Sequence, residues 1–150
     1  MYSDRLKEIR LRKHITQATL SSLLNIHEYV YGQYEREYTI IPIKHLNALS
    51  NYFNVSIDYI FGFTNHVQYN DVKQEIDEVL SGQRLKEFRK ENKITQAKLA
   101  TILNTVQPVI ANYEKGRNLI ATPFLYMICN KYHISADYLL GKVDYPKNLS

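Results

Sequence analysis

The chain contains two copies of one sequence pattern, and this internal repeat limits its possible folds more than any other feature. When the sequence is shifted by 79 positions, residues 5–62 align with residues 84–141 without a gap, and 22 of the 58 aligned positions are identical. Self-similarity at a fixed period indicates a duplicated structural unit. We therefore expect two units of similar architecture, each of about 60 residues and small enough to require compact helical packing.

The most similar stretch, residues 15–25 and 94–104, has the pattern of a short helix followed by a turn. Thr16 and Thr95 stand where an N-cap hydroxyl would accept from an early helical N–H group. Asn25 and Asn104 follow, and asparagine tolerates a left-handed backbone. A second periodic segment then ends in Tyr-Glu in both copies. Between cap and turn, apolar residues recur at helical spacing: Ala18, Leu20, Leu23 and Leu24, and Ala97, Leu99, Ile102 and Leu103. The pattern predicts helix, tight turn and helix, twice.

With these motifs both copies resemble the lambda-repressor/Cro-like helix-turn-helix family, also called XRE-type regulators. The resemblance covers nearly the whole chain. It rests on an arginine in the first helix, a Thr-Gln-Ala-x-Leu start of the second, a Tyr-Glu end of the third, and an Asp-Tyr-x-x-Gly ending at Gly62 and Gly141. It implies an all-α fold of two tandem five-helix domains joined by a short helical linker.

We expect a first helix-turn-helix domain over residues 1–66, a linker over 67–82, a second domain over 83–144 and a frayed tail over 145–150. The first helix is predicted at residues 4–13, capped by Ser3 and with Arg5 mostly outward, and its counterpart at 83–92. Ser81 and Gly82 should end a linker helix over residues 71–80, whose apolar residues share one face: Val72, Ile76, Val79 and Leu80.

Charge is distributed unevenly along the sequence. Residues 1–66 carry a net charge of +1, residues 67–82 carry −3 and residues 83–150 carry +6, which together give the net +4 of the chain. A basic surface attracts a phosphate backbone and an acidic one repels it. The second copy is therefore the stronger candidate for nucleic-acid binding.

The resemblance also implies one ion pair in each copy. In the family, the arginine of the first helix pairs with the glutamate that closes the third helix, which here gives Arg10 with Glu35 and Arg89 with Glu114. We interpret both pairs as structural, because a guanidinium fork matched to a carboxylate ties two helices together.

The third helix, expected over residues 28–36 and 107–115, enters the major groove in the resembling family. The outward positions would then read bases: Glu28, Tyr29 and Gln33 in the first copy, and Gln107, Pro108, Ala111 and Asn112 in the second. The Gln107 amide can donate to and accept from an adenine edge, although a solvated glutamine at a helix start is the simpler alternative. Glu28 can accept from a cytosine amino group but is repelled by nearby phosphates.

Phosphate contacts are expected at two places in each copy. Gln17 and Gln96 stand at the start of the second helix, where aligned N–H groups favour an anion. The loop after the third helix supplies Arg36 in the first copy, and Lys115, Arg117 and Asn118 in the second. Such contacts fix register rather than sequence preference.

Several function classes find no support in the sequence. Cys129 is the single cysteine, and we expect it in the core of a protein from a reducing cytoplasm, with no membrane span. The five histidines lack metal-ligand spacing, and no catalytic constellation or phosphate-binding glycine loop is present. We therefore expect no metal, no cofactor and no enzymatic activity.

Two functional classes remain. The first is a sequence-specific regulator that binds double-stranded DNA, either as an intramolecular pseudo-dimer or as a homodimer. The second is a protein-binding member of the same fold, such as an antitoxin or a phage-type antagonist, whose first copy contacts a protein through exposed aromatics such as Tyr29 and Tyr38. A steep loss of affinity with salt would distinguish DNA binding from protein binding.

Overall fold

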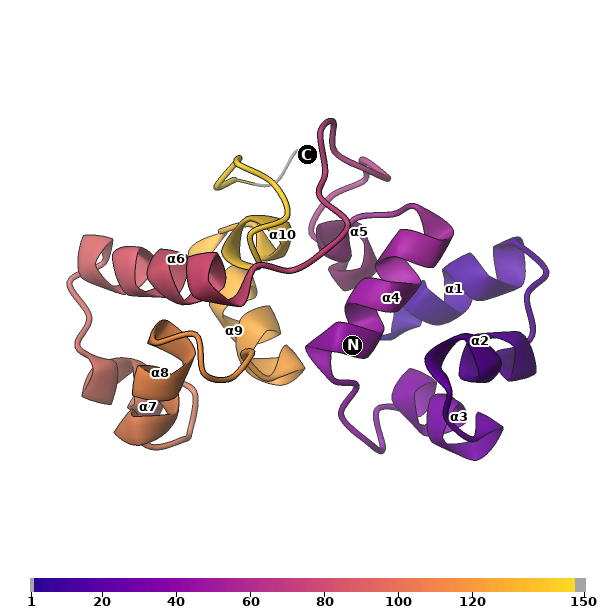
Figure 1. Cartoon of the computed structure of the whole chain (residues 1–150), viewed down its shortest axis with the longest axis horizontal. Helices are drawn as coiled ribbons and strands as arrows, with labels where there is room; N and C mark the ends of the chain where they lie inside the picture. The colour runs from indigo at the N-terminus through magenta and orange to yellow at the C-terminus, as the bar shows by residue number, and fades with distance from the viewer. Residues whose placement is uncertain (1, 148–150) are drawn as a thin grey trace. The chain divides into compact units, whose positions relative to one another are not determined.

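The computed structural model describes residues 2–147, and within that range every regular element is an α-helix (Figure 1). The described residues form two compact units, 2–70 and 71–147. The prediction of an all-α chain with two tandem helix-turn-helix domains is confirmed. No helix among the described residues is long and apolar enough to cross a membrane.

The two units repeat the same order of helices. The first contains α1 (Asp4–Arg12), α2 (Gln17–Leu24), α3 (Glu28–Arg36), α4 (Ile43–Phe53) and α5 (Ile57–Phe61). The second contains α6 (Glu78–Glu91), α7 (Gln96–Ile102), α8 (Gln107–Glu114), α9 (Thr122–Tyr132) and α10 (Ala136–Leu139). Within each unit the second and third helices lie side by side, as α2 with α3 and α7 with α8 (Figure 1).

Local chemistry explains where the second helices begin and turn. The Thr16 hydroxyl accepts from the Thr19 N–H group at 3.1 Å, and the Thr95 hydroxyl accepts from Lys98 N–H at 3.0 Å. Asn25 and Asn104 have φ values of 55° and 58°, a left-handed conformation that asparagine adopts more readily than most residues. The fold buries Cys129 together with the apolar faces, whose central members are Leu20, Leu46, Leu49 and Ile57, and Leu99, Leu103, Ile110 and Leu125.

The predicted linker helix over residues 71–80 is wrong. Residues 71–77 are irregular, and α6 begins at Glu78, where Asp77 caps it by accepting from Leu80 N–H at 3.0 Å. The N–H group of Lys73 donates to the Lys142 carbonyl at 2.8 Å, so this segment's backbone bonds to the end of the second unit instead of to itself. Val79 is 61% exposed, so the four apolar residues do not form one covered face.

The first helix of the second unit begins at Glu78, five residues before the predicted start at residue 83. Gly82 lies inside this helix and does not end one. A Cβ atom at Gly82 would lie 2.6 Å from the carbonyl oxygens of Tyr113 and Glu114, so only glycine permits this approach of α6 to α8. Ser3 holds the equivalent position and donates its hydroxyl to the Glu35 carbonyl at 2.9 Å. Ser3 therefore does not cap α1 as predicted.

The chain after α10 repeats the segment after α5. Ser135 N–H donates to the Pro146 carbonyl at 2.9 Å, as Ser56 N–H donates to the Val67 carbonyl at 2.8 Å. The prediction of a frayed tail is therefore wrong at Pro146, because its carbonyl accepts a hydrogen bond from the residue that precedes α10. Its last part, residues 148–150, lies outside the described residues.

Candidate nucleic-acid interface

A buried ion pair links the first and third helices of the second unit. The Arg89 Nε and Nη2 atoms donate to the two carboxylate oxygens of Glu114 at 2.7 and 3.0 Å, and Nη1 donates to the Ile94 carbonyl at 3.0 Å. The Glu114 side chain is only 4% exposed. A two-pronged contact of this kind fixes the geometry of both partners. It therefore holds α8 in a set orientation on α6.

A chain of hydrogen bonds continues from this pair to the start of α8. Gln96 Nε2 donates to Glu114 Oε1 at 3.0 Å, and Gln107 Nε2 donates to Gln96 Oε1 at 2.6 Å. A glutamine amide has two N–H groups and an oxygen with two lone pairs. This chain of contacts, which we call the amide relay, therefore leaves one N–H group and the oxygen of Gln107 for an external partner.

The first unit contains the same ion pair but a different end to the relay. Arg10 Nε and Nη2 donate to Glu35 at 2.7 and 2.9 Å, and Gln17 Nε2 donates to Glu35 Oε1 at 3.1 Å. Burial opposes the charge on Glu35, but the hydrogen bonds from Arg10 and Gln17 hold its pKa below the usual value of 4.5. At the position of Gln107 stands Glu28, a carboxylate that has no N–H group to donate to Gln17.

The residues predicted to read bases lie at the surface of α3 and α8. Glu28 and Tyr29 are exposed, as are Gln107 and Pro108, while Gln33, Ala111 and Asn112 are partly covered. The Gln33 oxygen accepts from the Thr39 hydroxyl at 2.9 Å. Val106 stands at the N-cap position of α8, and its apolar side chain cannot accept a hydrogen bond from the N–H groups of the first turn.

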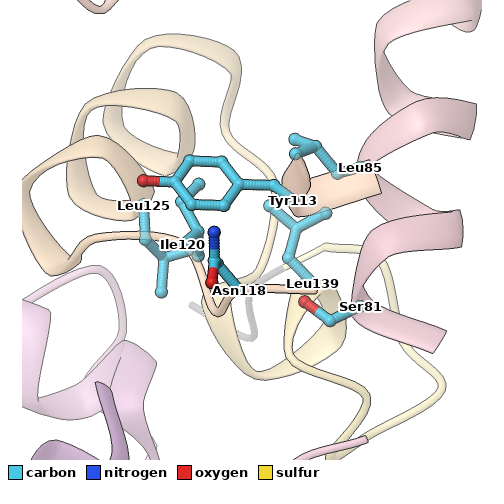
Figure 2. A pocket seen from close by; sticks show the side chains of 7 residues that line it. All are labelled: Ser81, Leu85, Tyr113, Asn118, Ile120, Leu125 and Leu139. Carbon is cyan, nitrogen blue, oxygen red and sulfur yellow. The ribbon is translucent and has the colours of Figure 1, made fainter. Parts of the chain in front are cut away.

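The residues predicted to bind phosphate have different surroundings. Lys115 and Arg117 are exposed in the loop after α8, and the Arg36 guanidinium lies 5.4 Å from the centre of the Tyr38 ring. Asn118 borders a cavity of about 10 Å³, next to Tyr113 and Leu139 (Figure 2). This cavity has room for about one water molecule. Gln17 and Gln96 each donate one amide N–H group to the buried glutamate of their unit, and a primary amide carries a second N–H group.

The second unit has a lower net charge in the structure than the division of the sequence into domains and linker predicted. The acidic residues 71–78 belong to the second unit, whose net charge over residues 71–147 is +3 instead of +6. Gly116 has a φ of 72° and lies against the backbone of Glu78 and Val79. The loop that carries Lys115 and Arg117 is thus next to the acidic start of α6, which reduces its attraction for a phosphate.

Sequence reasoning missed a second repeated arginine contact. Arg84 is 8% exposed, donates to the Tyr138 and Val143 carbonyls at 2.6 and 2.7 Å, and lies 4.1 Å from the centre of the Tyr138 ring. Arg5 repeats this contact with the Thr64 carbonyl at 3.2 Å and the Tyr59 ring at 4.6 Å. The identity of both Arg and Tyr in the two copies was the available signal. These arginines join the first and fifth helices, so they are structural.

Each unit therefore has two short helices joined by a tight turn, with an exposed first turn on the second of them, which defines a helix-turn-helix domain. Comparison with known families agrees. A family described as a helix-turn-helix domain matches residues 82–145, and one described as helix-turn-helix matches residues 6–60.

Three proteins of Bacillus subtilis (strain 168) are similar to parts of the chain. The uncharacterized HTH-type transcriptional regulator YobD is 35% identical over 65 residues, which are 43% of this chain and 58% of that protein. The HTH-type transcriptional regulator ImmR is 39% identical over 66 residues, or 44% and 52% of the two proteins. The SPbeta prophage-derived uncharacterized HTH-type transcriptional regulator YonR is 33% identical over 81 residues, or 54% and 69%.

The chain belongs to the XRE-type helix-turn-helix family and carries two copies of the domain in tandem. The matched part spans little more than half the length of YobD and ImmR. No solved structure gives a significant match.

Proposed function

We propose that this protein is a sequence-specific, double-stranded DNA-binding transcriptional regulator that reads the major groove with α8 of its second unit. The amide relay is the observation that carries this proposal, because it fixes the Gln107 side chain at the exposed start of α8 with one N–H group and the oxygen unused by the relay. These two groups match the donor and acceptor pattern of an adenine edge.

The second unit has further features that suit DNA. The exposed cations Lys115 and Arg117 follow α8, and Lys98 lies in the first turn of α7. Cations placed beside a reading helix contact phosphates and set its register. In the first unit Glu28 stands at the position of Gln107 and has no N–H group to donate, so the last hydrogen bond of the relay is missing there. We therefore expect the first unit to contribute less to base reading.

The test is a binding-site selection on random duplex DNA, followed by titrations of the selected and a scrambled duplex at several salt concentrations. A regulator of this kind selects a defined motif and loses affinity steeply with salt. The stoichiometry on the selected duplex separates an intramolecular pseudo-dimer, with one chain per site, from a homodimer. Equal affinity for both duplexes would exclude sequence-specific reading.

A second function is favoured by the surface of the first unit. Tyr29 and Tyr38 are 70% and 75% exposed, and Ile40 nearby in sequence is 58% exposed. Exposed aromatic residues are enriched in protein interfaces. A protein partner at the first unit would therefore bind at Tyr29 and Tyr38. Substitution of Tyr38 by serine tests this, since Tyr38 is not among the predicted base-reading residues and the variant should weaken capture of such a partner while leaving the affinity for the selected DNA unchanged.

A further inference from the structure

The first unit contains a groove that the DNA-binding function does not use. It measures about 360 Å³ and lies between the ends of α1 and α4, the start of α5 and the segment after α5. This volume is within the range of sites that bind small molecules. The groove has an apolar floor of buried side chains and a rim that carries two exposed cations; the floor consists of Ile9, Phe53, Val55 and Tyr59, and the cations are Arg12 and Lys13.

The rim attracts anions because the charged side chains that line the groove are both cationic. Arg12 shares its charge with Glu8 in an exposed ion pair, whereas Lys13 extends the positive surface beyond that pair. Two backbone carbonyls at the helix ends near the groove are already engaged. The carbonyls of Ile9 and Ser50 already accept the N–H groups of Lys13 and Val55 at 3.1 and 3.0 Å.

The equivalent groove of the second unit is smaller and has the opposite charge. It measures about 120 Å³, and Glu91 lines it at the position that Arg12 occupies in the first unit. Phe88 replaces Ile9 and packs edge-on against Tyr132, with ring centres 4.9 Å apart. Because both units have the same fold, the fold itself does not require a large cationic groove in the first.

We propose that this groove binds a small organic anion with an apolar body, of the class of aromatic or medium-chain carboxylates and sulfonates. The apolar body lies on Ile9, Phe53 and Val55, and the anionic group lies between Arg12 and Lys13. Such a ligand stabilises the folded first unit by mass action. It also binds to α1, the helix whose Arg10 holds Glu35 of α3.

The test uses 1-anilinonaphthalene-8-sulfonate, an apolar anion, and N-phenyl-1-naphthylamine, its uncharged analogue, with the full chain and no DNA. Calorimetric titration should give one sulfonate per chain, with at least tenfold weaker binding of the amine. The sulfonate should also raise the melting temperature, which excludes binding to unfolded chains. The absence of DNA makes this result independent of the proposed regulatory function.

Three variants locate the site. Arg12→Glu introduces the residue type of the second unit at an exposed position and should weaken sulfonate binding at least tenfold. Ile9→Phe should block the groove without changing its charge, and circular dichroism will show whether that variant is folded. Glu91→Gln, the matched control in the second unit, should leave binding unchanged. The proposal is overturned by sulfonate binding that Arg12→Glu leaves intact, by equal binding of the uncharged analogue, or by a lowered melting temperature.

Discussion

Gln107 donates its side-chain amide to Gln96 over 2.6 Å, and Gln96 donates to Glu114 over 3.0 Å. Because Arg89 holds Glu114 from α6, the orientation of the Gln107 amide depends on residues from three helices. The first unit repeats the arginine, the glutamate and the first glutamine, but it ends in Glu28. The two units thus share one scaffold and present different chemistry to a ligand.

Replacing Gln107 by alanine should cost about 1 to 3 kcal/mol of binding free energy on the selected duplex, because one pair of base contacts is lost. Affinity for a scrambled duplex should change little. Fluorescence-anisotropy titrations of both duplexes measure the difference. Glu28→Ala is the matched control in the first unit and should have a smaller effect on sequence preference. Equal losses on both duplexes would show that Gln107 does not read a base.

The sequence predicted the fold of each unit well because the deciding signals are local. Threonine caps, left-handed asparagines and apolar spacing define α2 and α7 without knowledge of the rest of the chain. The start of α6 was missed because Gly82 reads as a helix end in sequence, whereas its role is the close approach to Glu114. The relay was missed because the distance between Gln96 and Gln107 depends on how α7 and α8 pack. Spacing along the chain does not give that distance.

Removing the glutamate of either buried ion pair should strongly destabilise its unit. Glu35→Ala or Glu114→Ala leaves a buried guanidinium unpaired, and losing one partner of a buried pair costs about 3 to 5 kcal/mol. Glu8→Ala is the control, because its pair with Arg12 is more than half exposed on both sides and is worth at most about 1 kcal/mol. Denaturant titrations of the three variants measure these costs. A Glu35→Ala midpoint no lower than that of Glu8→Ala would contradict the assigned role.

Glu35 should also make stability depend on pH. Its pKa in the folded unit is lower than the usual 4.5, so folding favours the carboxylate. The resulting stability is complete above pH 4.5 and is lost as the pH falls through the lower, folded pKa. Melting temperatures recorded from pH 7 to pH 3 should therefore fall less steeply for Glu35→Gln than for the parent chain. Parallel curves would mean that Glu35 has the same pKa in the folded and unfolded chains.

Gly82→Ala should lower the stability of the second unit by about 1 to 3 kcal/mol, because the added methyl group would meet two backbone carbonyls at 2.6 Å and force α6 away from α8. Gly32→Ala is the matched control. Its methyl group would meet the flexible end of Gln17 at 3.3 Å, and alanine favours a helix over glycine by about 1 kcal/mol. Thermal melts should show a loss for the first variant only. A neutral Gly82→Ala would mean that α6 can shift without cost.

Arg117→Ala should weaken binding to all duplexes alike, because we propose that this exposed cation in the loop after α8 contacts phosphates and not base edges. The slope of log affinity against log salt should fall by roughly one ion. Lys131→Ala removes the same charge from α9 of the same unit and serves as the control for net charge. Titrations at four salt concentrations on specific and scrambled DNA separate the two effects. If both variants change the slope equally, net charge alone accounts for it. If Arg117→Ala changes sequence preference, Arg117 reads bases.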